Sequence, residues 1–143
     1  MRGRHALGIA AALLLLGVAC STERIDLDLD VAAAPNPVPG VPDGAERTWR
    51  FTVAVANPTG VGVFLESMHR EILDTDTGYA SPLLPEANLE VRGRYIPPGG
   101  TLSFEVSQRT LGAPFRNATE RRLYHARGDD GRFYSGEVFV RLE

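Results

Sequence analysis

Cysteine and lysine are the scarcest residues in this chain: Cys20 is the only cysteine in 143 residues, and all 15 basic side chains are arginine. A single cysteine excludes an intramolecular disulfide, so the fold depends on burial and hydrogen bonding alone. The arginines are scattered, which indicates the codon bias of a GC-rich genome more than a recognition role. After Cys20 the chain carries 13 arginines against 18 acidic residues, a balance of −5. This balance argues against a nucleic-acid partner, because nucleic-acid binding requires a basic surface.

Long apolar runs are also absent, with one exception near the start. Residues 6–19 contain no charge and follow the basic pentapeptide MRGRH. This run is too short to span a bilayer, which takes about 20 apolar residues. Its length fits the apolar centre of a secretory signal. The residues just before Cys20 are small or aliphatic: Leu16, Gly17, Val18 and Ala19.

The stretch LLLLGVACS at 13–21 resembles the lipobox of bacterial lipoproteins, in which aliphatic and small residues precede an obligatory cysteine. The resemblance implies cleavage between Ala19 and Cys20 and a diacylglyceryl group on the Cys20 thiol. It also implies an exported protein anchored to the membrane of the cell envelope. Some lipoproteins carry an aspartate directly after the cysteine, and this aspartate retains them at the inner membrane. Here that position is Ser21, which favours the outer membrane in a cell with two membranes. Gly17 stands where the family most often has leucine, and it also fits an ordinary secreted protein, so a freely secreted domain is the alternative.

The chain is expected to have three parts. A signal peptide at 1–19 is a helical segment that is cleaved off, and a lipidated tether follows at 20–23. A β-sandwich domain occupies 24–143 and contains a proline-rich connector at 32–46. Within RIDLDLDV at 24–31, apolar residues alternate strictly with aspartates, which predicts a first strand. The alternative is that residues 21–46 form one long spacer. Clean alternation is rare in solvated linkers, so the strand is favoured.

The rest of the chain has the pattern of short strands separated by turn sequences. Apolar residues alternate through 47–56, and a Gly-Asp-Asp-Gly turn at 128–131 separates the two halves of a hairpin. Residues 61–74 fit both a helix and a long, bulged strand; the flanking turn sequences favour a strand. We therefore predict an all-β protein, an immunoglobulin-like antiparallel sandwich of about seven strands. The chain resembles immunoglobulin-like domains and, in VAVANPTGVGV and YIPPGGTLSFEV, the WHy-type domains of late embryogenesis abundant proteins.

Few residues have the spacing of a reactive site. His69 and His125 have no neighbour at metal-ligand spacing, and no nucleophile or phosphate-loop motif is present. We therefore expect a protein that is not an enzyme and has no cofactor. Asp74 and Asp76 have the opening spacing of a calcium loop, but its later ligands are absent, and a hydrated turn is favoured over a metal site.

These observations predict a membrane-anchored envelope lipoprotein whose domain binds or scaffolds an envelope protein partner. The alternative is a freely secreted β-sandwich that binds a small ligand or calcium through its acidic turns.

Overall fold

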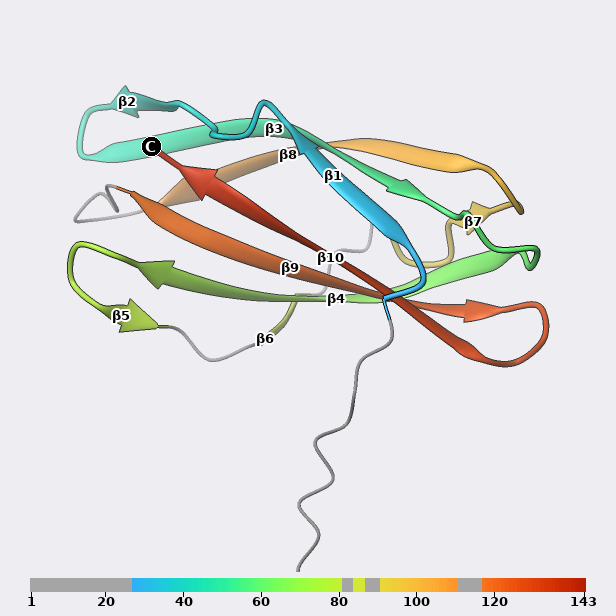
Figure 1. Cartoon of the computed structure of the whole chain (residues 1–143). Coiled ribbons are helices and arrows are strands. Elements are labelled where there is room, and N and C mark those ends of the chain that lie inside the picture. Colours follow the sequence, from blue (N-terminus) through green and yellow to red (C-terminus); the bar gives the residue numbers. More distant parts are fainter. Residues whose placement is uncertain (1–26, 81–83, 87–90, 111–116) are drawn as a thin grey trace, which may run out of the picture.

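The computed structural model describes residues 27–80, 84–86, 91–110 and 117–143, and in these ranges every regular element is a β-strand. The predicted signal peptide and tether lie outside the described residues. Figure 1 shows two layers of strands, one above the other. The strands are β1 (Asp30–Ala34), β2 (Gly40–Asp43), β3 (Glu46–Ala56), β4 (Val63–Asp74), β5 (Tyr79–Ala80), β6 (Leu84–Glu86), β7 (Tyr95–Ile96), β8 (Thr101–Thr110), β9 (Ala118–Gly128) and β10 (Phe133–Leu142). The prediction of an all-β protein with antiparallel sheets is confirmed.

The first sheet is built around β3. Strand β8 pairs along one edge of β3, from Arg47–Thr110 to Ala56–Thr101. The other edge is shared: β1 pairs with the C-terminal half of β3, and β2 with its N-terminal end. All three pairings are antiparallel, so this sheet is three strand positions wide.

The second sheet has the order β10-β9-β4, and the short strands β5, β6 and β7 each pair with the far edge of β4. Strands β9 and β10 form the hairpin predicted across 128–131, paired from Arg127–Phe133 to Ala118–Leu142. No helix long and apolar enough to cross a membrane occurs in the described ranges.

The N-terminal part of the domain crosses between the two sheets. The N–H groups of Asp28 and Leu29 donate to the Ser135 carbonyl of β10 at 2.8 and 3.0 Å, before the chain enters the first sheet as β1. It returns to β10 at Val38, whose N–H donates to the Arg141 carbonyl at 2.7 Å. It then re-enters the first sheet as β2. The edge of β10 is thus covered at two separate points.

Two sequence predictions need correction in this region. Of the strand predicted at 24–31, residues 24–26 lie outside the described residues and β1 begins at Asp30; the residues at 32–46 are not a connector, because they contribute to β1, β2 and the start of β3. Proline did not exclude a strand here, because Pro42 lies in β2, which pairs on one edge only, where a missing N–H costs no ladder bond. Pro37 and Pro39 flank Val38, which supplies both the N–H and the carbonyl that bond to the β10 end.

Strand β4 confirms the prediction of a bulged strand at 61–74. Its pairing with β9 shifts by one residue between Leu65 and Ser67. Because of this β-bulge, the buried residues of β4 run Val63, Leu65, Met68, with one step of three instead of two. That step explains why the sequence also fitted a helix.

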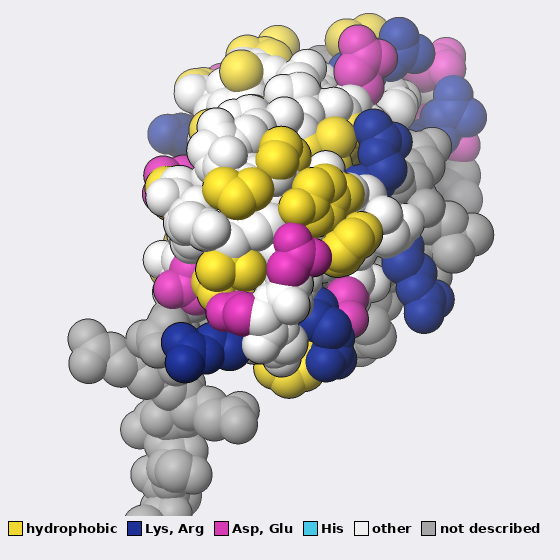
Figure 2. Space-filling view, turned by 90° about the vertical axis from the view of Figure 1, so that its right-hand side faces the viewer, with side chains coloured by type: hydrophobic (Ala, Val, Ile, Leu, Met, Phe, Trp, Pro, Cys, Tyr) yellow, Lys and Arg dark blue, Asp and Glu magenta, His cyan; other side chains and the backbone are white. Residues whose placement is uncertain are grey.

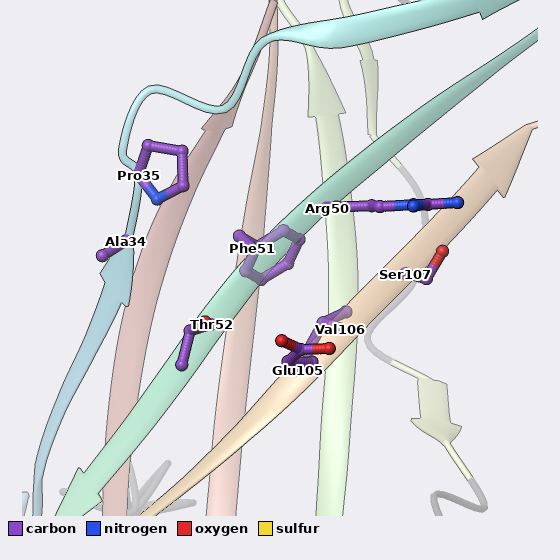
Figure 3. Close-up of a pocket in the computed structure, with 8 residues that line it drawn as sticks. All are labelled: Ala34, Pro35, Arg50, Phe51, Thr52, Glu105, Val106 and Ser107. Carbon is purple, nitrogen blue, oxygen red and sulfur yellow. The ribbon is translucent and has the colours of Figure 1, made fainter.

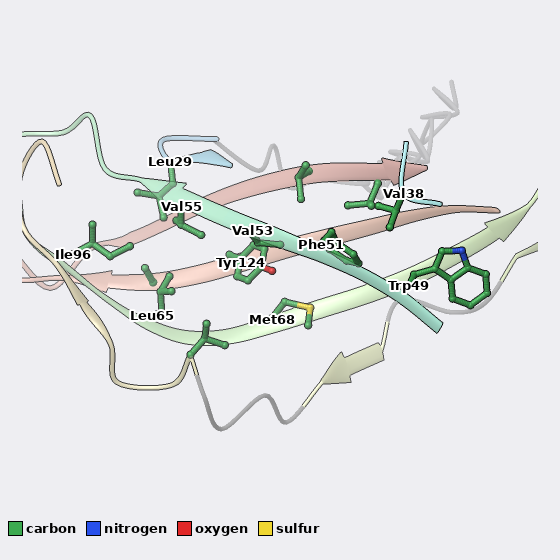
Figure 4. Close-up of a cluster of buried hydrophobic side chains, with 14 of the residues drawn as sticks. Leu29, Val38, Trp49, Phe51, Val53, Val55, Leu65, Met68, Ile96 and Tyr124 are labelled. Atoms are coloured by element: carbon green, nitrogen blue, oxygen red, sulfur yellow. The ribbon is translucent and has the colours of Figure 1, made fainter. Parts of the chain in front are cut away.

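The core lies between the sheets, and most of its large side chains come from β3, β4 and β9 (Figure 4). Trp49, Phe51, Val53 and Val55 all point inward, as the alternation predicted, and the Trp49 indole N–H donates to the Glu143 carbonyl at 3.1 Å. The buried apolar set comprises Leu29, Val38, Trp49, Phe51, Val53, Val55, Val63, Leu65, Met68, Val91, Ile96, Ala118, Tyr124, Ala126, Val138, Val140 and Leu142. The core thus closes the sandwich without a disulfide.

Candidate functional site

The residues predicted from the lipobox, Ala19 and Cys20, lie outside the described residues. The acidic pair at the β4–β5 turn lies within them. Asp74 is buried at the end of β4, and its Oδ1 accepts the N–H groups of Asp76 and Thr77 at 2.9 and 3.3 Å. Its carboxylate therefore builds the turn, whereas Asp76 is exposed. In the described ranges no group of three or more His, Cys, Asp and Glu side chains is arranged to hold a metal ion.

His69 and His125, 56 positions apart in sequence, are brought together on the second sheet. Their rings stand edge to face with centroids 5.0 Å apart, and His125 Nδ1 lies 3.1 Å from Ser135 Oγ. Burial, and secondarily the charge of His69, lower the pKa of His125. No sequence pattern indicated this pair, because the contact depends on the shifted register between β4 and β9.

A buried ion pair on β9 was also missed. Glu120 and Arg122 both point into the sandwich, and their side chains contact through Glu120 Oε1 and Arg122 Nε. The Arg122 guanidinium lies 5.1 Å from the centre of the Phe51 ring. Burial raises the pKa of Glu120 despite the opposing charge of Arg122. The alternation with the buried Tyr124 and Ala126 was the signal that both charges face inward.

The first sheet carries a hollow of about 850 Å³, drawn in Figure 3. It lies on the outer face of that sheet, meaning the face turned away from the second sheet. Arg50 extends from β3 toward Ser107 of β8, and Glu105 lies further along β8, paired in register with Thr52. The full lining is Ala34, Pro35, Arg50, Phe51, Thr52, Glu105, Val106 and Ser107. The hollow therefore offers a cation, an anion, two hydroxyls and the apolar residues Ala34 and Pro35 at its side.

A second hollow, of about 470 Å³, lies at the bulge of β4 and is lined by Phe64, Leu65, Glu66, Ser67, Arg92 and Gly93. It adjoins the end of the sandwich where Figure 2 shows hydrophobic side chains gathered among charged ones. There the Phe64 and Tyr95 rings contact with centroids 4.7 Å apart. The hydrogen bond that Tyr95 donates to Asp129, at 3.0 Å, raises the pKa of Tyr95.

Comparison with known proteins supports the fold alone. No protein-family model and no curated protein matches the chain. A structural genomics target called SoR45 is similar with a TM-score of 0.66 and 17% identity, over 83% of this chain and 88% of that one. The putative ApaA protein from Bordetella pertussis is similar with a TM-score of 0.60 and 19% identity, over 83% of this chain and 98% of that one.

A further solved structure is similar over part of its own length. It is the alkylpurine DNA glycosylase AlkC of Pseudomonas fluorescens, bound to DNA with an abasic site analogue. The likeness has a TM-score of 0.37 and 13% identity, over 82% of this chain and 31% of that one. The comparisons support no statement of enzyme status, so the expectation that the chain is not an enzyme is withdrawn. The match is too partial to assign an activity.

Proposed function

We propose that this chain is an envelope lipoprotein, held to a membrane by a lipid on Cys20, whose domain binds a protein partner. The observation that carries the anchor is the sequence of aliphatic and small residues that ends at Cys20. Lipidation of this kind supplies more than one acyl chain, and two or more chains anchor a protein firmly where one gives marginal binding. The described domain starts at Leu27, close behind that cysteine.

The domain that follows is proposed to be an immunoglobulin-like sandwich. With β1 and β2 counted together as strand A, β3 as B and β8 as E, one sheet has the order A-B-E. Strands β4, β9 and β10 take the places of C, F and G in the other sheet, and the short strands β5, β6 and β7 pair with β4. This division into an A-B-E sheet and a C-F-G sheet supports the proposal. Strand switching by the first strand, between β10 and β3, is consistent with it.

The hollow on the first sheet is the proposed binding surface for the partner. It runs beside β8, which among the described residues pairs with β3 only, so its outer edge retains free backbone donors and acceptors. An extended segment of a partner adds readily to such an edge. Arg50 and Glu105 then provide charges of both signs for side chains of that segment.

The anchor is tested by Cys20→Ser in the full chain, followed by separation of membrane and soluble fractions of the producing cells. We expect the variant to lose membrane attachment and to keep its signal, because both lipidation and cleavage require the thiol. Ser21→Ala is the matched control, and it should remain processed and membrane-bound. A Cys20→Ser variant that is processed and attached as before would falsify the anchor.

The binding surface is tested by placing a photo-crosslinking residue at Ser107 in intact cells. The expected result is a discrete crosslinked species that disappears when Arg50→Glu is added. Crosslinking from Arg141, on the opposite side of the molecule, serves as the control and should not give that species. The proposal is wrong if the species is absent, or if it is unchanged by both Arg50→Glu and Glu105→Arg.

A further inference from the structure

Three strongly exposed apolar side chains lie along β10 and the segment bridged to it. Leu27 is 51% exposed, Phe133 is 67% and Phe139 is 54%. We call these three residues the β10 face. Scattered exposed apolar residues are ordinary on soluble proteins, but neighbouring ones on a single face mark an interaction surface.

The three side chains share one face because of the strand geometry. Leu27 forms a bridge with Ser135, so it lies beside the first part of β10. Phe133 precedes Ser135 by two residues and Phe139 follows it by four, so all three β10 positions point to the same side. At about 3.3 Å per residue, Phe133 and Phe139 lie about 7 and 13 Å along the strand from Ser135, in opposite directions. That side is the outer face of the second sheet, because Val138 and Val140, which flank Phe139, are buried in the core.

The lipid attachment point is within a short reach of this face. Seven residue steps separate Cys20 from Leu27. A fully extended chain spans at most about 3.6 Å per residue, so Leu27 lies no more than about 25 Å from the lipidated residue. The β10 face is therefore the apolar surface that starts where the tether enters the domain.

The charged groups among these side chains are already neutralised. Arg127 lies over the Phe133 ring at 4.6 Å and pairs with Glu66 at 2.7 Å. Arg121, paired in register with Phe139, contacts Glu137 at 2.8 Å and Glu71 at 3.7 Å. A face of apolar side chains whose neighbouring arginines are paired with carboxylates favours the interface of a bilayer over water, and it has no attraction to anionic lipid.

We propose that the β10 face docks on the lipid surface that holds the anchor, with Leu27, Phe133 and Phe139 in contact with acyl chains. This inference rests on the lipid anchor proposed above. It fixes the orientation of the domain: the second sheet lies toward the membrane, and the hollow on the first sheet faces away from it. A partner then has access to Arg50 and Glu105 from the aqueous side.

The test uses the lipidated full chain in phosphatidylcholine vesicles. Since lipid occupies the only native thiol, Arg141→Cys introduces a single attachment point for a fluorophore on the β10 side, and Ser103→Cys does so on the outer face of the first sheet. Quenching by bromine-labelled acyl chains is compared with quenching by aqueous iodide. We expect lipid quenching at 141 and iodide quenching at 103.

The contribution of the apolar side chains is tested with Phe133→Ser and Phe139→Ser together. Lipid quenching at 141 should then fall to the level at 103, while the protein stays in the vesicle fraction through its anchor. Val41→Ser removes an equally exposed apolar residue from another face and should change nothing. Thermal melting of each variant confirms that it is folded.

Each outcome is decisive. Equal iodide quenching at 141 and 103 in a lipidated chain overturns docking and leaves the anchor intact. Shielding of 141 from both quenchers means that protein, such as a second copy, covers the face, which also overturns the inference. A chain that carries no lipid and remains in solution overturns the proposed function itself, and docking with it. Unchanged quenching with anionic phosphatidylglycerol in the vesicles supports docking by apolar contact.

Discussion

Glu120 and Arg122 are two charged side chains buried inside the sandwich, with the buried Gln108 beside them. Glu120 is fully buried and Arg122 is 2% exposed. Their contact, together with the Phe51 ring beneath the guanidinium, offsets the cost of removing both charges from water. Losing one partner leaves the other charge buried and unbalanced, so the two residues are expected to behave as a unit.

The first prediction concerns that unit. Arg122→Met should lower the free energy of unfolding by about 3–5 kcal/mol, the usual cost of stranding one member of a buried pair. Adding Glu120→Gln should recover part of this loss. Urea unfolding of the two single variants and the double variant measures the coupling. If the losses of unfolding free energy in the two single variants simply add in the double variant, Glu120 and Arg122 do not behave as a unit.

The raised pKa of Glu120 predicts a pH dependence. Because the folded state holds this proton more tightly than the unfolded state, the group contributes stability at low pH that is lost as the pH rises through the raised pKa. Glu120→Gln should therefore abolish that decline, so that wild type loses stability relative to the variant as the pH rises from about 4.5. Melting temperatures across this range provide the measurement, and parallel curves would be the contrary result.

For His125 the sign is opposite. Burial lowers the pKa of His125, so the unfolded state takes up the proton first and stability is lost as the pH falls below about 6.5. His125→Gln should flatten the stability curve between neutral and mildly acidic pH. Thr119→Gln, on the same face of β9, is the control. If stability still falls as steeply with falling pH in His125→Gln, burial of the His125 ring is not the cause of that pH dependence.

Among the strands, β4 depends most on a single inserted residue. The bulge at Glu66 lets Leu65 and Met68 both point inward. In a strand without a bulge, every residue beyond that point would face the other side. The insertion therefore decides which face of the second half of β4 points into the core.

Deletion of Glu66 should accordingly unfold the protein or cost several kcal/mol, because it turns Met68 and the residues after it away from the core. Glu66→Ala, which keeps the residue count, should cost about 1 kcal/mol or less as the loss of an exposed ion pair. Circular dichroism and thermal melting compare the two variants. Equal stability of both would mean that the register of β4 is not set by the bulge.

The strands that could be predicted from the sequence were those with local alternation. Trp49 to Val55 follow period two without interruption, so their inward face was evident. The pairs Glu120–Arg122 and His69–His125 were not, because they depend on the register between strands and on which face a sheet turns inward. The prolines at 35–42 were misread as a connector, because local composition does not reveal that these residues bond alternately to β10 and β3.

At the scale of the whole molecule, the proposed anchor, the proposed orientation and the proposed binding surface fit together. Leu27, the first described residue, lies beside β10, where Phe133 and Phe139 are also exposed, and the hollow of Arg50 and Glu105 lies on the opposite sheet. Such an arrangement suits a domain that stands close to a membrane and presents one face to a partner. All of it depends on the modification of one residue.

The intact mass of the chain purified from the membrane fraction tests that dependence most directly. The account predicts a polypeptide that lacks residues 1–19, starts at Cys20 and carries the added mass of a diacylglyceryl group on that residue. A mature chain that starts at Cys20 or nearby with an unmodified thiol, or one that retains its first 19 residues, would contradict it.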